Sequence, residues 1–328
     1  MREIRYIEAI REAQQEEMSR DKSVFMFGEG IGPRGGCWTQ TKGMWPRFGE
    51  KRLIDVPLSE NGFVGLAIFA AATGLRPIVD MMFWDFANEA FGQIVNQAAR
   101  IRYMSNGQFN VPIVIHGAIG VGRSAGGHHS GRLYPAYCNM PGLKVILPAT
   151  PYDAKGLLKT AIRDDDPVLL FEHRTLINTT GPVPDKEYTV PFGEAIVRRE
   201  GTDVTLVATA AMVLVALRVA EALAGEGISV EVVDPRTLVP FDKEGILDSI
   251  RKTGRLVVVD EAFSPCGIGG EIAALAADEA FDYLDSPVKR IHSLSVPEPM
   301  SPSLETAMLP GDDHVIAAVR ELMNQSPI

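Results

Sequence analysis

Short, continuous apolar runs alternate along this chain with longer segments of helical periodicity, and this alternation restricts the fold more than any other feature. Parallel strands covered on both faces have such uninterrupted runs, whereas strands with one wet face alternate apolar and polar residues. The sequence therefore predicts an α/β protein whose sheets are mostly parallel and flanked by helices. In the first half, the predicted strands are residues 23–27, 77–82, 111–115, 143–147 and 168–171.

The segments between these runs predict the covering helices. From Ala87 to Ile101, apolar residues recur at spacings of three and four, which predicts one long helix with an apolar stripe. Thr150 and Pro151 are residue types that favour the N-cap and the first position of a helix, and this helix is expected to end near residue 162. The apolar stretch from Gly62 to Leu75 predicts a buried helix.

Length and a change of pattern predict two domains. The 328 residues correspond to about two domains at roughly 150 residues each. Periodicity fades between Arg174 and Pro191, where polar residues and three prolines are typical of an interdomain linker. We therefore predict a first domain over residues 1–187 and a smaller α/β domain over residues 188–328. Its predicted strands are residues 204–208, 229–233 and 256–260, with helices ending near 223, spanning 243–251 and beginning near 270.

Charge and composition exclude several classes of protein. The chain has 32 Lys and Arg against 42 Asp and Glu, a net charge of −10, which argues against binding to a phosphate backbone. Its longest apolar stretches end after 14 residues, short of the ~20 needed to span a bilayer. The N-terminus lacks the features of a signal peptide, and the three cysteines, predicted to be buried, have no disulfide or metal spacing. We expect a cytoplasmic protein that binds neither nucleic acid nor membranes.

The first candidate site residue is Glu60, in a loop expected at the carboxyl edge of the sheet. Ligands usually bind at this edge in open α/β folds. Ser59 is suited to cap a helix that begins at Glu60, and the residues that follow are nearly all apolar. A carboxylate at the head of such a helix needs a partner if it is buried. The alternative is a glutamate that only stabilises the helix dipole.

Three further features occupy similar loops. The run from Phe83 to Phe86 predicts either a stacking wall for a flat ring or an ordinary core strand. Five glycines between Gly117 and Gly127 precede the adjacent histidines His128 and His129, whose side chains diverge and so do not favour zinc. The acidic run 164–166 predicts either a cation site or a solvated turn.

Taken together, these motifs resemble the β chain of the E1 component of 2-oxo acid dehydrogenase complexes, the thiamine-diphosphate-dependent enzymes of the pyruvate, branched-chain and acetoin type. The resemblance runs nearly end to end. It implies a transketolase-like pyrimidine-binding domain followed by a transketolase C-terminal domain. The motifs that carry it are Gly28-Glu29, Gly35-Gly36, Pro57-Leu58-Ser59-Glu60, Gly74-Leu75-Arg76-Pro77, Arg100-Ile101-Arg102-Tyr103, Gly127-His128-His129-Ser130, Pro141-Gly142-Leu143-Lys144-Val145, Ala154-Lys155-Gly156-Leu157-Leu158, Ala161-Ile162-Arg163-Asp164 and Asp234-Pro235-Arg236-Thr237-Leu238-Val239-Pro240.

The resemblance also implies roles for individual residues. Glu60 would hydrogen-bond the aminopyrimidine of thiamine diphosphate and promote the tautomer that removes the reactive proton of the cofactor. Phe86 would stack on that ring, and Glu29 would also contact the cofactor. His129 would lie near the entrance for the lipoyl group of the E2 chain, where an imidazole transfers a proton, with His128 as the weaker candidate.

Ion sites and partners follow from the same resemblance. A potassium site would correspond to the carbonyls of Ile113 and Ala161 together with Asp164 and Asp166. The Gly-Asp-Gly motif with a following Asn, which holds magnesium and the diphosphate, is absent here and would belong to an E1 α chain. We therefore expect this chain to be inactive alone and to work in an α2β2 tetramer on a 2-oxo acid, with lipoyl-bearing E2 as acceptor.

Two departures from the family pattern bear on the site. Gly131 stands where the family usually has Gln, and Gly30 stands where it usually has an acidic residue. The substrate stays open among pyruvate, branched-chain 2-oxo acids and acetoin. Arg123 and Arg132 beside the histidines keep open the C-terminal part of a split transketolase that acts on sugar phosphates. A non-catalytic scaffold is the alternative from another class, which retention of Glu60 disfavours.

Overall fold

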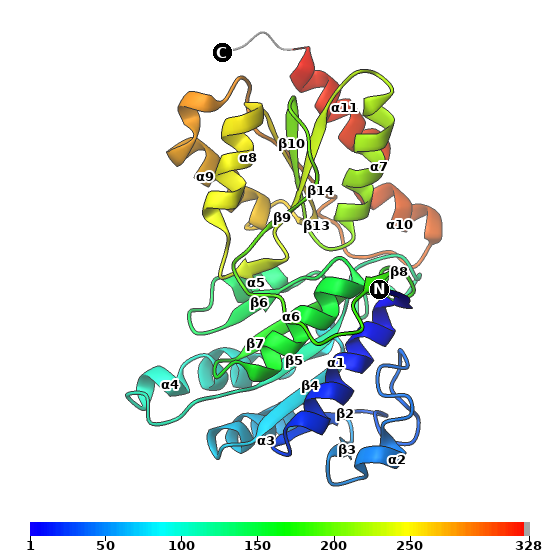
Figure 1. Cartoon of the computed structure of the whole chain (residues 1–328), viewed down its shortest axis with the longest axis vertical. Coiled ribbons are helices and arrows are strands. Elements are labelled where there is room, and N and C mark those ends of the chain that lie inside the picture. Colours follow the sequence, from blue (N-terminus) through cyan, green and yellow to red (C-terminus); the bar gives the residue numbers. More distant parts are fainter. Residues whose placement is uncertain (325–328) are drawn as a thin grey trace. The chain divides into compact units, whose positions relative to one another are not determined.

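The computed structural model describes residues 1–324 and divides into two compact units (Figure 1). The first unit contains residues 1–120 and 128–192. The second contains residues 121–127 and the chain from Gly193 onward. The boundary at residue 193 lies a few residues after the predicted one at residue 188. The short excursion of residues 121–127 into the second unit interrupts the first, and no change of periodicity in the sequence marks it.

Six parallel strands form the main sheet of the first unit, in the order β6-β7-β5-β4-β2-β3. Their core residues are almost fully buried, as expected for strands covered on both faces. Two further strands pair with each other in antiparallel fashion at the beginning and end of the unit. The strands are β1 (Arg2–Arg5), β2 (Val24–Gly28), β3 (Leu53–Asp55), β4 (Arg76–Phe83), β5 (Val114–Ile119), β6 (Lys144–Ile146), β7 (Val168–His173) and β8 (Thr180–Val183).

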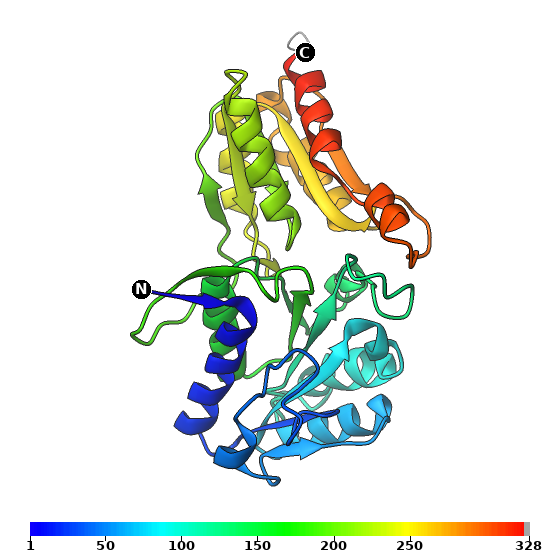
Figure 2. The ribbon, with the colours of Figure 1, turned by 90° about the vertical axis from the view of Figure 1, so that its right-hand side faces the viewer.

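Helices cover both faces of this sheet. The long helices α1 and α6 lie side by side on one face, and α3 with the π-helix η2 lies on the other (Figure 2). The helices of the first unit are α1 (Tyr6–Arg20), α2 (Trp45–Phe48), α3 (Glu60–Ala72), the 3₁₀ helix η1 (Trp84–Asn88), η2 (Gln93–Ala98), α4 (Ile101–Met104), α5 (Tyr134–Cys138) and α6 (Pro151–Arg163).

The second unit has its own five-stranded sheet in the order β14-β13-β10-β11-β9, in which only β9 runs antiparallel to its neighbour. Helices α7 and α11 pack together on one face, and α8 and α9 on the other (Figure 1). The elements are β9 (Ile196–Arg199), β10 (Val204–Ala208), α7 (Met212–Ala224), β11 (Val230–Asp234), β12 (Thr237–Val239), α8 (Lys243–Thr253), β13 (Leu256–Phe263), α9 (Ile268–Glu279), η3 (Phe281–Tyr283), β14 (Lys289–Ser293), α10 (Pro302–Met308) and α11 (Asp312–Met323).

Each unit has a bulge at the same place in a central strand. In β4 the pairing register shifts between Asp80 and Phe83, and in β13 it shifts between Asp260 and Phe263. The Asp80 carboxylate accepts a hydrogen bond from the Met82 N–H at 2.8 Å, two residues further on, and Asp260 holds its own bulge in the same way. Because a bulge re-aims the residues beside it, it determines where the side chains at the strand's carboxyl end point.

The α/β class and the mostly parallel sheets predicted from the sequence are confirmed. Strand β10 has the predicted bounds, and the side chain of Thr150 caps α6 by accepting a hydrogen bond from the Asp153 N–H at 3.2 Å. The third predicted strand begins later than expected, at Val114. Pro112 has no N–H to donate to a ladder, so pairing starts after it.

Three other predictions are wrong. Residues 87–101 form no single helix, since the π-turn of η2 interrupts the regular spacing. The predicted linker contains β8, which forms because the N-terminal residues of β1 pair with it. Helix α3 is not buried on all sides, because Leu66 and Phe69 are exposed.

Burial was predicted for all three cysteines, and a membrane-spanning helix was not expected. Cys37 and Cys138 are half-buried, but Cys266 is exposed, because it sits in a turn with positive φ after β13. No disulfide joins cysteines in the described chain. Between residues 1 and 324, no helix is long and apolar enough to cross a membrane.

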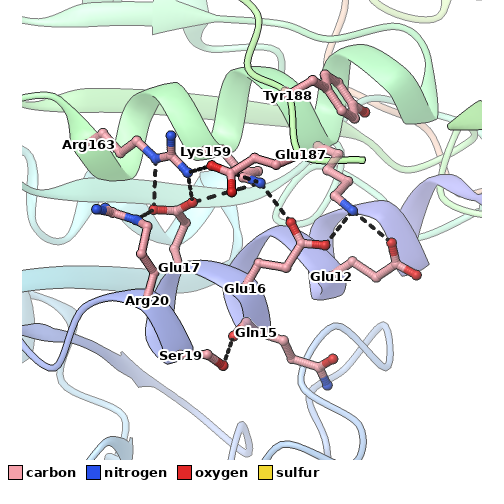
Figure 3. Close-up of polar contacts among 12 residues, drawn as sticks. Glu12, Gln15, Glu16, Glu17, Ser19, Arg20, Lys159, Arg163, Glu187 and Tyr188 are labelled. Carbon is pink, nitrogen blue, oxygen red and sulfur yellow. Dashed lines mark hydrogen bonds and ion pairs between the residues drawn. The ribbon is translucent and has the colours of Figure 1, made fainter. Parts of the chain in front are cut away.

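A buried ion network fastens α1 to α6 (Figure 3). The Glu17 carboxylate, with 1% of its side chain exposed, accepts hydrogen bonds from Arg163 at 2.6 and 3.0 Å and from Arg20 at 2.7 Å. Beside it, the buried Lys159 ammonium lies 2.7 Å from Glu16. The charges of Glu17 and Lys159 are removed from water and depend on their partners, whereas Arg20, Arg163 and Glu16 are partly exposed.

We expect Glu17→Gln to lower the free energy of unfolding by about 2 kcal/mol, because the amide nitrogen cannot accept from Arg163 or Arg20 and the buried Lys159 loses a negative charge 4.0 Å away. Thermal unfolding of the full chain measures this as a clear drop in the melting temperature. Asp248→Asn is the matched control, since its side chain is 75% exposed and pairs with Arg251 at 2.9 Å on the surface. Equal shifts for the two variants would contradict this account.

Candidate active site

The candidate site residues lie at the carboxyl edge of the first unit's sheet. Glu29 follows β2, Glu60 opens α3 after β3, Phe86 lies in η1 after β4, and His129 follows β5. Strands β3, β2, β4 and β5 are consecutive neighbours in the sheet. The fold therefore brings to one edge four side chains that span about a hundred residues of sequence, and this edge is where open α/β sheets bind ligands.

Glu29 and Glu60 form an acidic pair at this edge. Burial raises the pKa of Glu29, and the charges of Glu60, Asp80 and Asp55 raise it further. The Oε1 atom of Glu29 is buried and has no hydrogen-bond partner. A buried acceptor without a donor is costly to the folded protein, so this oxygen indicates a place for a donor group of a ligand.

Glu60 occupies the first position of α3, as the sequence predicts, and is half-buried. Ser59 precedes it at the N-cap position, but its hydroxyl makes no capping hydrogen bond, which corrects the predicted cap. The Ser59 carbonyl instead accepts from Gly62 and Phe63, at 2.9 and 3.0 Å. The helix therefore begins with backbone hydrogen bonds and without a side-chain cap.

Aromatic rings frame His129 in the same unit. The His129 ring lies edge to face with Phe83 and with Phe86, at centroid distances of 4.8 and 5.3 Å. Trp84 turns the other way into the core, where it stacks on Phe171 at 3.9 Å. The run from Phe83 to Phe86 therefore agrees in part with each interpretation of the sequence. Trp84 belongs to the core, and Phe86 is half-buried, so part of its ring is exposed.

Backbone N–H groups of the glycine-rich segment are held by carboxylates. In the second unit, Glu261 accepts from Val121 at 2.8 Å, and Glu305 accepts from Ser124 at 2.9 Å. In the first unit, Asp85 accepts from Gly131. The sequence reasoning missed these three acids. Of the three, only Asp85 stands out in the sequence, because it is a charged residue within the aromatic run 83–86.

The side chains next to the histidine pair differ in exposure. His128 is exposed, whereas His129 is half-buried. The hydroxyl of the buried Ser130 accepts a hydrogen bond at 2.9 Å from Arg174, which also lies over the Phe83 ring. Over residues 1–324 no cluster of three or more His, Cys, Asp or Glu is arranged to hold a metal ion.

The acidic turn after α6 is neutralised by basic side chains. Lys144 lies 2.7 Å from both carboxylate oxygens of Asp164, and Arg102 pairs with Asp166. The carbonyl of Ile113 accepts from the Val168 N–H, and that of Ala161 from the Asp164 N–H. All four predicted potassium ligands already have partners within the chain, and the potassium site stays a prediction.

Comparison with known proteins identifies the class to which this fold and edge belong. The family described as "Transketolase, pyrimidine binding domain" matches residues 2–180, and "Transketolase, C-terminal domain" matches residues 193–315. The solved structure of a "Split gene transketolase, inactive beta4 tetramer" has the same fold, with a TM-score of 0.80 at 22% identity, covering 98% of this chain and 99% of that chain. The chain therefore belongs to the transketolase-like family.

Curated relatives narrow this family to one kind of subunit. The β subunit of the acetoin:2,6-dichlorophenolindophenol oxidoreductase of Bacillus subtilis is 44% identical, covering 97% of this chain and 96% of the relative. The 2-oxoisovalerate dehydrogenase β subunit of the same organism is also 44% identical, covering 97% and 98%. The pyruvate dehydrogenase E1 β subunit of Rickettsia felis is 44% identical, covering 96% and 97%. The resemblance to E1 β chains predicted from the motifs is confirmed.

We expect Glu29→Gln to stabilise the protein at pH 8. The raised pKa of Glu29 means that its ionisation favours the unfolded state. That penalty is fully present above the folded pKa and disappears below the ordinary pKa of a glutamate, so the gain in melting temperature should shrink as the pH falls. Thermal unfolding across this pH range measures it, with the exposed Glu50→Gln as control. A gain that does not depend on pH would contradict the proposed cause.

Proposed function

We propose that this chain is the β subunit of a thiamine-diphosphate-dependent E1 enzyme that decarboxylates a 2-oxo acid, either pyruvate or a branched-chain acid, and transfers the acyl group to the lipoyl group of an E2 chain. The observation that carries the proposal is the acidic pair of Glu29 and Glu60 at the sheet edge, with one buried oxygen lacking a donor. The family depends on thiamine diphosphate, and its first domain is described as pyrimidine-binding.

The residues at this edge fit the aminopyrimidine of the cofactor. That ring has an amino donor, which suits a carboxylate, and ring nitrogens, which accept from a carboxyl group that holds a proton. Its flat face suits an aromatic side chain. Glu60 would bond a ring nitrogen, the orphan oxygen of Glu29 would accept from a donor, and Phe86 would stack on the ring. When bound, the cofactor supplies the carbanion chemistry. Glu60 holds and moves a proton at the ring nitrogen, where a charge-assisted hydrogen bond is strongest out of water.

The overall reaction balances with the lipoyl disulfide as oxidant. The bond between the carboxylate and the carbonyl carbon of the 2-oxo acid breaks, and carbon dioxide leaves. The sulfur–sulfur bond of the lipoyl group breaks as it takes up two electrons from the acyl carbon. The acyl carbon, oxidised by these two electrons, forms a bond to one lipoyl sulfur, and the other sulfur takes up a proton. We propose that His129 donates this proton, as a positioned imidazole does in general acid catalysis.

Magnesium and the diphosphate would be held by the α chain of an α2β2 tetramer, because the motif that binds them is absent from this sequence. The names of the relatives as β subunits imply an α partner. Exposed apolar side chains support a partner chain at α3 and α4: Leu66 and Phe69 on α3 are 66% and 57% exposed, and Tyr103 and Met104 on α4 are also exposed. We also propose a cytoplasmic location, on the sequence features alone.

Two alternative substrates can be distinguished from a 2-oxo acid by experiment. Acetoin is a possible substrate, since the relative in Bacillus subtilis named for acetoin is as similar as those named for 2-oxo acids. A sugar-phosphate substrate is the second alternative, and the two arginines that kept it open differ. Arg132 is buried and donates to the Ser130 carbonyl at 3.1 Å, whereas Arg123 is exposed. Turnover of one substrate by the chain with its α partner, in a panel of pyruvate, branched-chain 2-oxo acids and acetoin, decides among them.

We expect Glu60→Gln to reduce decarboxylation at least ~100-fold in the assembled enzyme, because a neutral amide cannot take up the proton that the carboxylate moves. The measurement is turnover with 2,6-dichlorophenolindophenol as artificial acceptor, with cofactor occupancy determined on the same sample. Glu50→Gln, an exposed carboxylate of the same unit, should keep full turnover. Unchanged turnover in Glu60→Gln would contradict the catalytic assignment.

We expect Phe69→Glu to abolish co-purification of the α chain, because a charge on the exposed face of α3 would have to be buried unpaired in the interface. Circular dichroism should show that the variant keeps its helix content, since 57% of the Phe69 side chain is exposed. Phe281→Glu, at a similarly exposed aromatic residue of the second unit, is the control and should still bind α. Retention of the α chain by Phe69→Glu would exclude this face as the contact.

A further inference from the structure

Asp85 contacts the backbone of the segment that carries His129. It lies in η1, directly after the bulged strand β4. Its two carboxylate oxygens lie 3.0 and 3.2 Å from the Gly131 nitrogen and share that N–H. Burial raises the pKa of Asp85, while the Gly131 N–H and the charges of His129 and Arg174 act in the opposite direction. Because both oxygens of this half-buried carboxylate accept from a loop backbone, Asp85 is positioned to hold that loop.

Gly131 is fixed from two sides of the first unit. While its N–H binds Asp85, its carbonyl accepts from the Gly120 N–H at 3.1 Å, at the end of β5. Ser130, one residue earlier, is held through its hydroxyl by Arg174. Of these contacts, only that of Asp85 comes from the same short segment as the rings that touch His129.

That segment surrounds the imidazole. Phe83 and Phe86, on either side of Asp85 in the sequence, both contact the His129 ring at nearly perpendicular angles of 88° and 80°. The rings restrict the imidazole laterally, but edge-to-face contacts alone leave its backbone free to shift. The Asp85 contact with Gly131 adds a restraint, because it ties the backbone two residues after His129 to the segment 83–86, which carries both rings.

The contact between Asp85 and the Gly131 N–H also depends on the absence of a side chain at residue 131. A Cβ at Gly131 would lie 2.5 Å from Oδ1 of Asp85 and 3.1 Å from its Cγ, closer than such atoms approach. The conflict is one of space, since the φ angle of Gly131 lies outside the left-handed region. The departure of Gly131 from the Gln usual in the family is therefore coupled to Asp85.

We propose that Asp85 is a positioning residue for His129, which it holds in place through the Gly131 amide, and that Gly131 is required because Asp85 occupies the space of its side chain. This proposal rests on the proposed function in one respect: it assigns the restraint to transfer of the acyl group to lipoyl, the step given to His129. Asp85 itself touches no reacting atom. It acts by fixing the direction of the imidazole, and a misplacement of about 1 Å is enough to slow an oriented step greatly.

The test compares two activities of the assembled enzyme. Decarboxylation with 2,6-dichlorophenolindophenol does not need the lipoyl group, whereas acylation of a free lipoyl domain does. We expect Asp85→Ala to reduce lipoyl acylation about tenfold or more, with dye-linked turnover and thiamine diphosphate affinity within about twofold of the parent. Asp85→Asn should recover most of the loss, because its amide oxygen still accepts from Gly131. An equal loss of both activities, or no loss of either, would overturn the proposal.

A double-mutant cycle tests the coupling to Gly131. Gly131→Ala should resemble Asp85→Ala, but adding it to Asp85→Ala should cause no further loss, because the carboxylate that it would strike is gone. Additive losses would contradict the coupling. Glu50→Ala serves as the control for removal of a carboxylate elsewhere in the unit.

A spectroscopic readout separates failure of this proposal from failure of the proposed function. In protein labelled at histidine carbons, the His129 ring signal should be displaced by the ring currents of Phe83 and Phe86. Asp85→Ala should move it toward the position of a mobile histidine, and Asp85→Asn should not. His129→Gln assigns the signal. This result is independent of turnover, so an enzyme inactive on every substrate would sink the proposed function while the signal still tests the role of Asp85.

Discussion

The common carboxyl edge of six parallel strands is the constraint on which the rest of this structure depends. Glu29, Glu60, Phe86 and His129 come from four different loops, and they share one edge only because β3, β2, β4 and β5 are neighbours that run in the same direction. The sheet is stable in this form because helices cover both faces and remove its apolar runs from water. A site assembled in this way is as rigid as the sheet, which suits chemistry that requires a fixed ring and a fixed proton acceptor.

Carboxylates that accept from backbone N–H groups fix loops in both units. Asp85 holds Gly131 in the first unit, and Glu261 and Glu305 hold the segment 121–127 in the second. Each contact satisfies an acid and an N–H group at once, so neither is left without a partner away from water. Glu29 is the exception among these acids, because one of its oxygens is buried without a donor. The fold stabilises the loops with paired acids and keeps an unpaired acid where a ligand is proposed to bind.

The sequence predicted what depends on local pattern and missed what depends on contacts between distant residues. Strand β10 and the capped start of α6 agree with the structure, because apolar runs and capping residues act within a few positions. The pairing of β1 with β8 and the excursion of residues 121–127 are set by partners more than a hundred residues away. Among site residues, Glu60 was visible as a charge before an apolar helix. Asp85 was visible only as a charge inside an aromatic run, and its role was not, because that role depends on a backbone N–H 46 residues further along the chain.

The central claim is that the edge of the first unit holds the aminopyrimidine of thiamine diphosphate with Glu60 moving its proton, and hydrogen exchange tests it without any substrate. The measurement is the rate of deuterium exchange at the reactive carbon of the cofactor bound to the assembled α and β chains, in the parent and in Glu60→Gln. We predict exchange far faster than in the free cofactor, and at least ~100-fold slower in Glu60→Gln than in the parent. Equal rates in the two proteins, with the cofactor bound to both, would contradict the account.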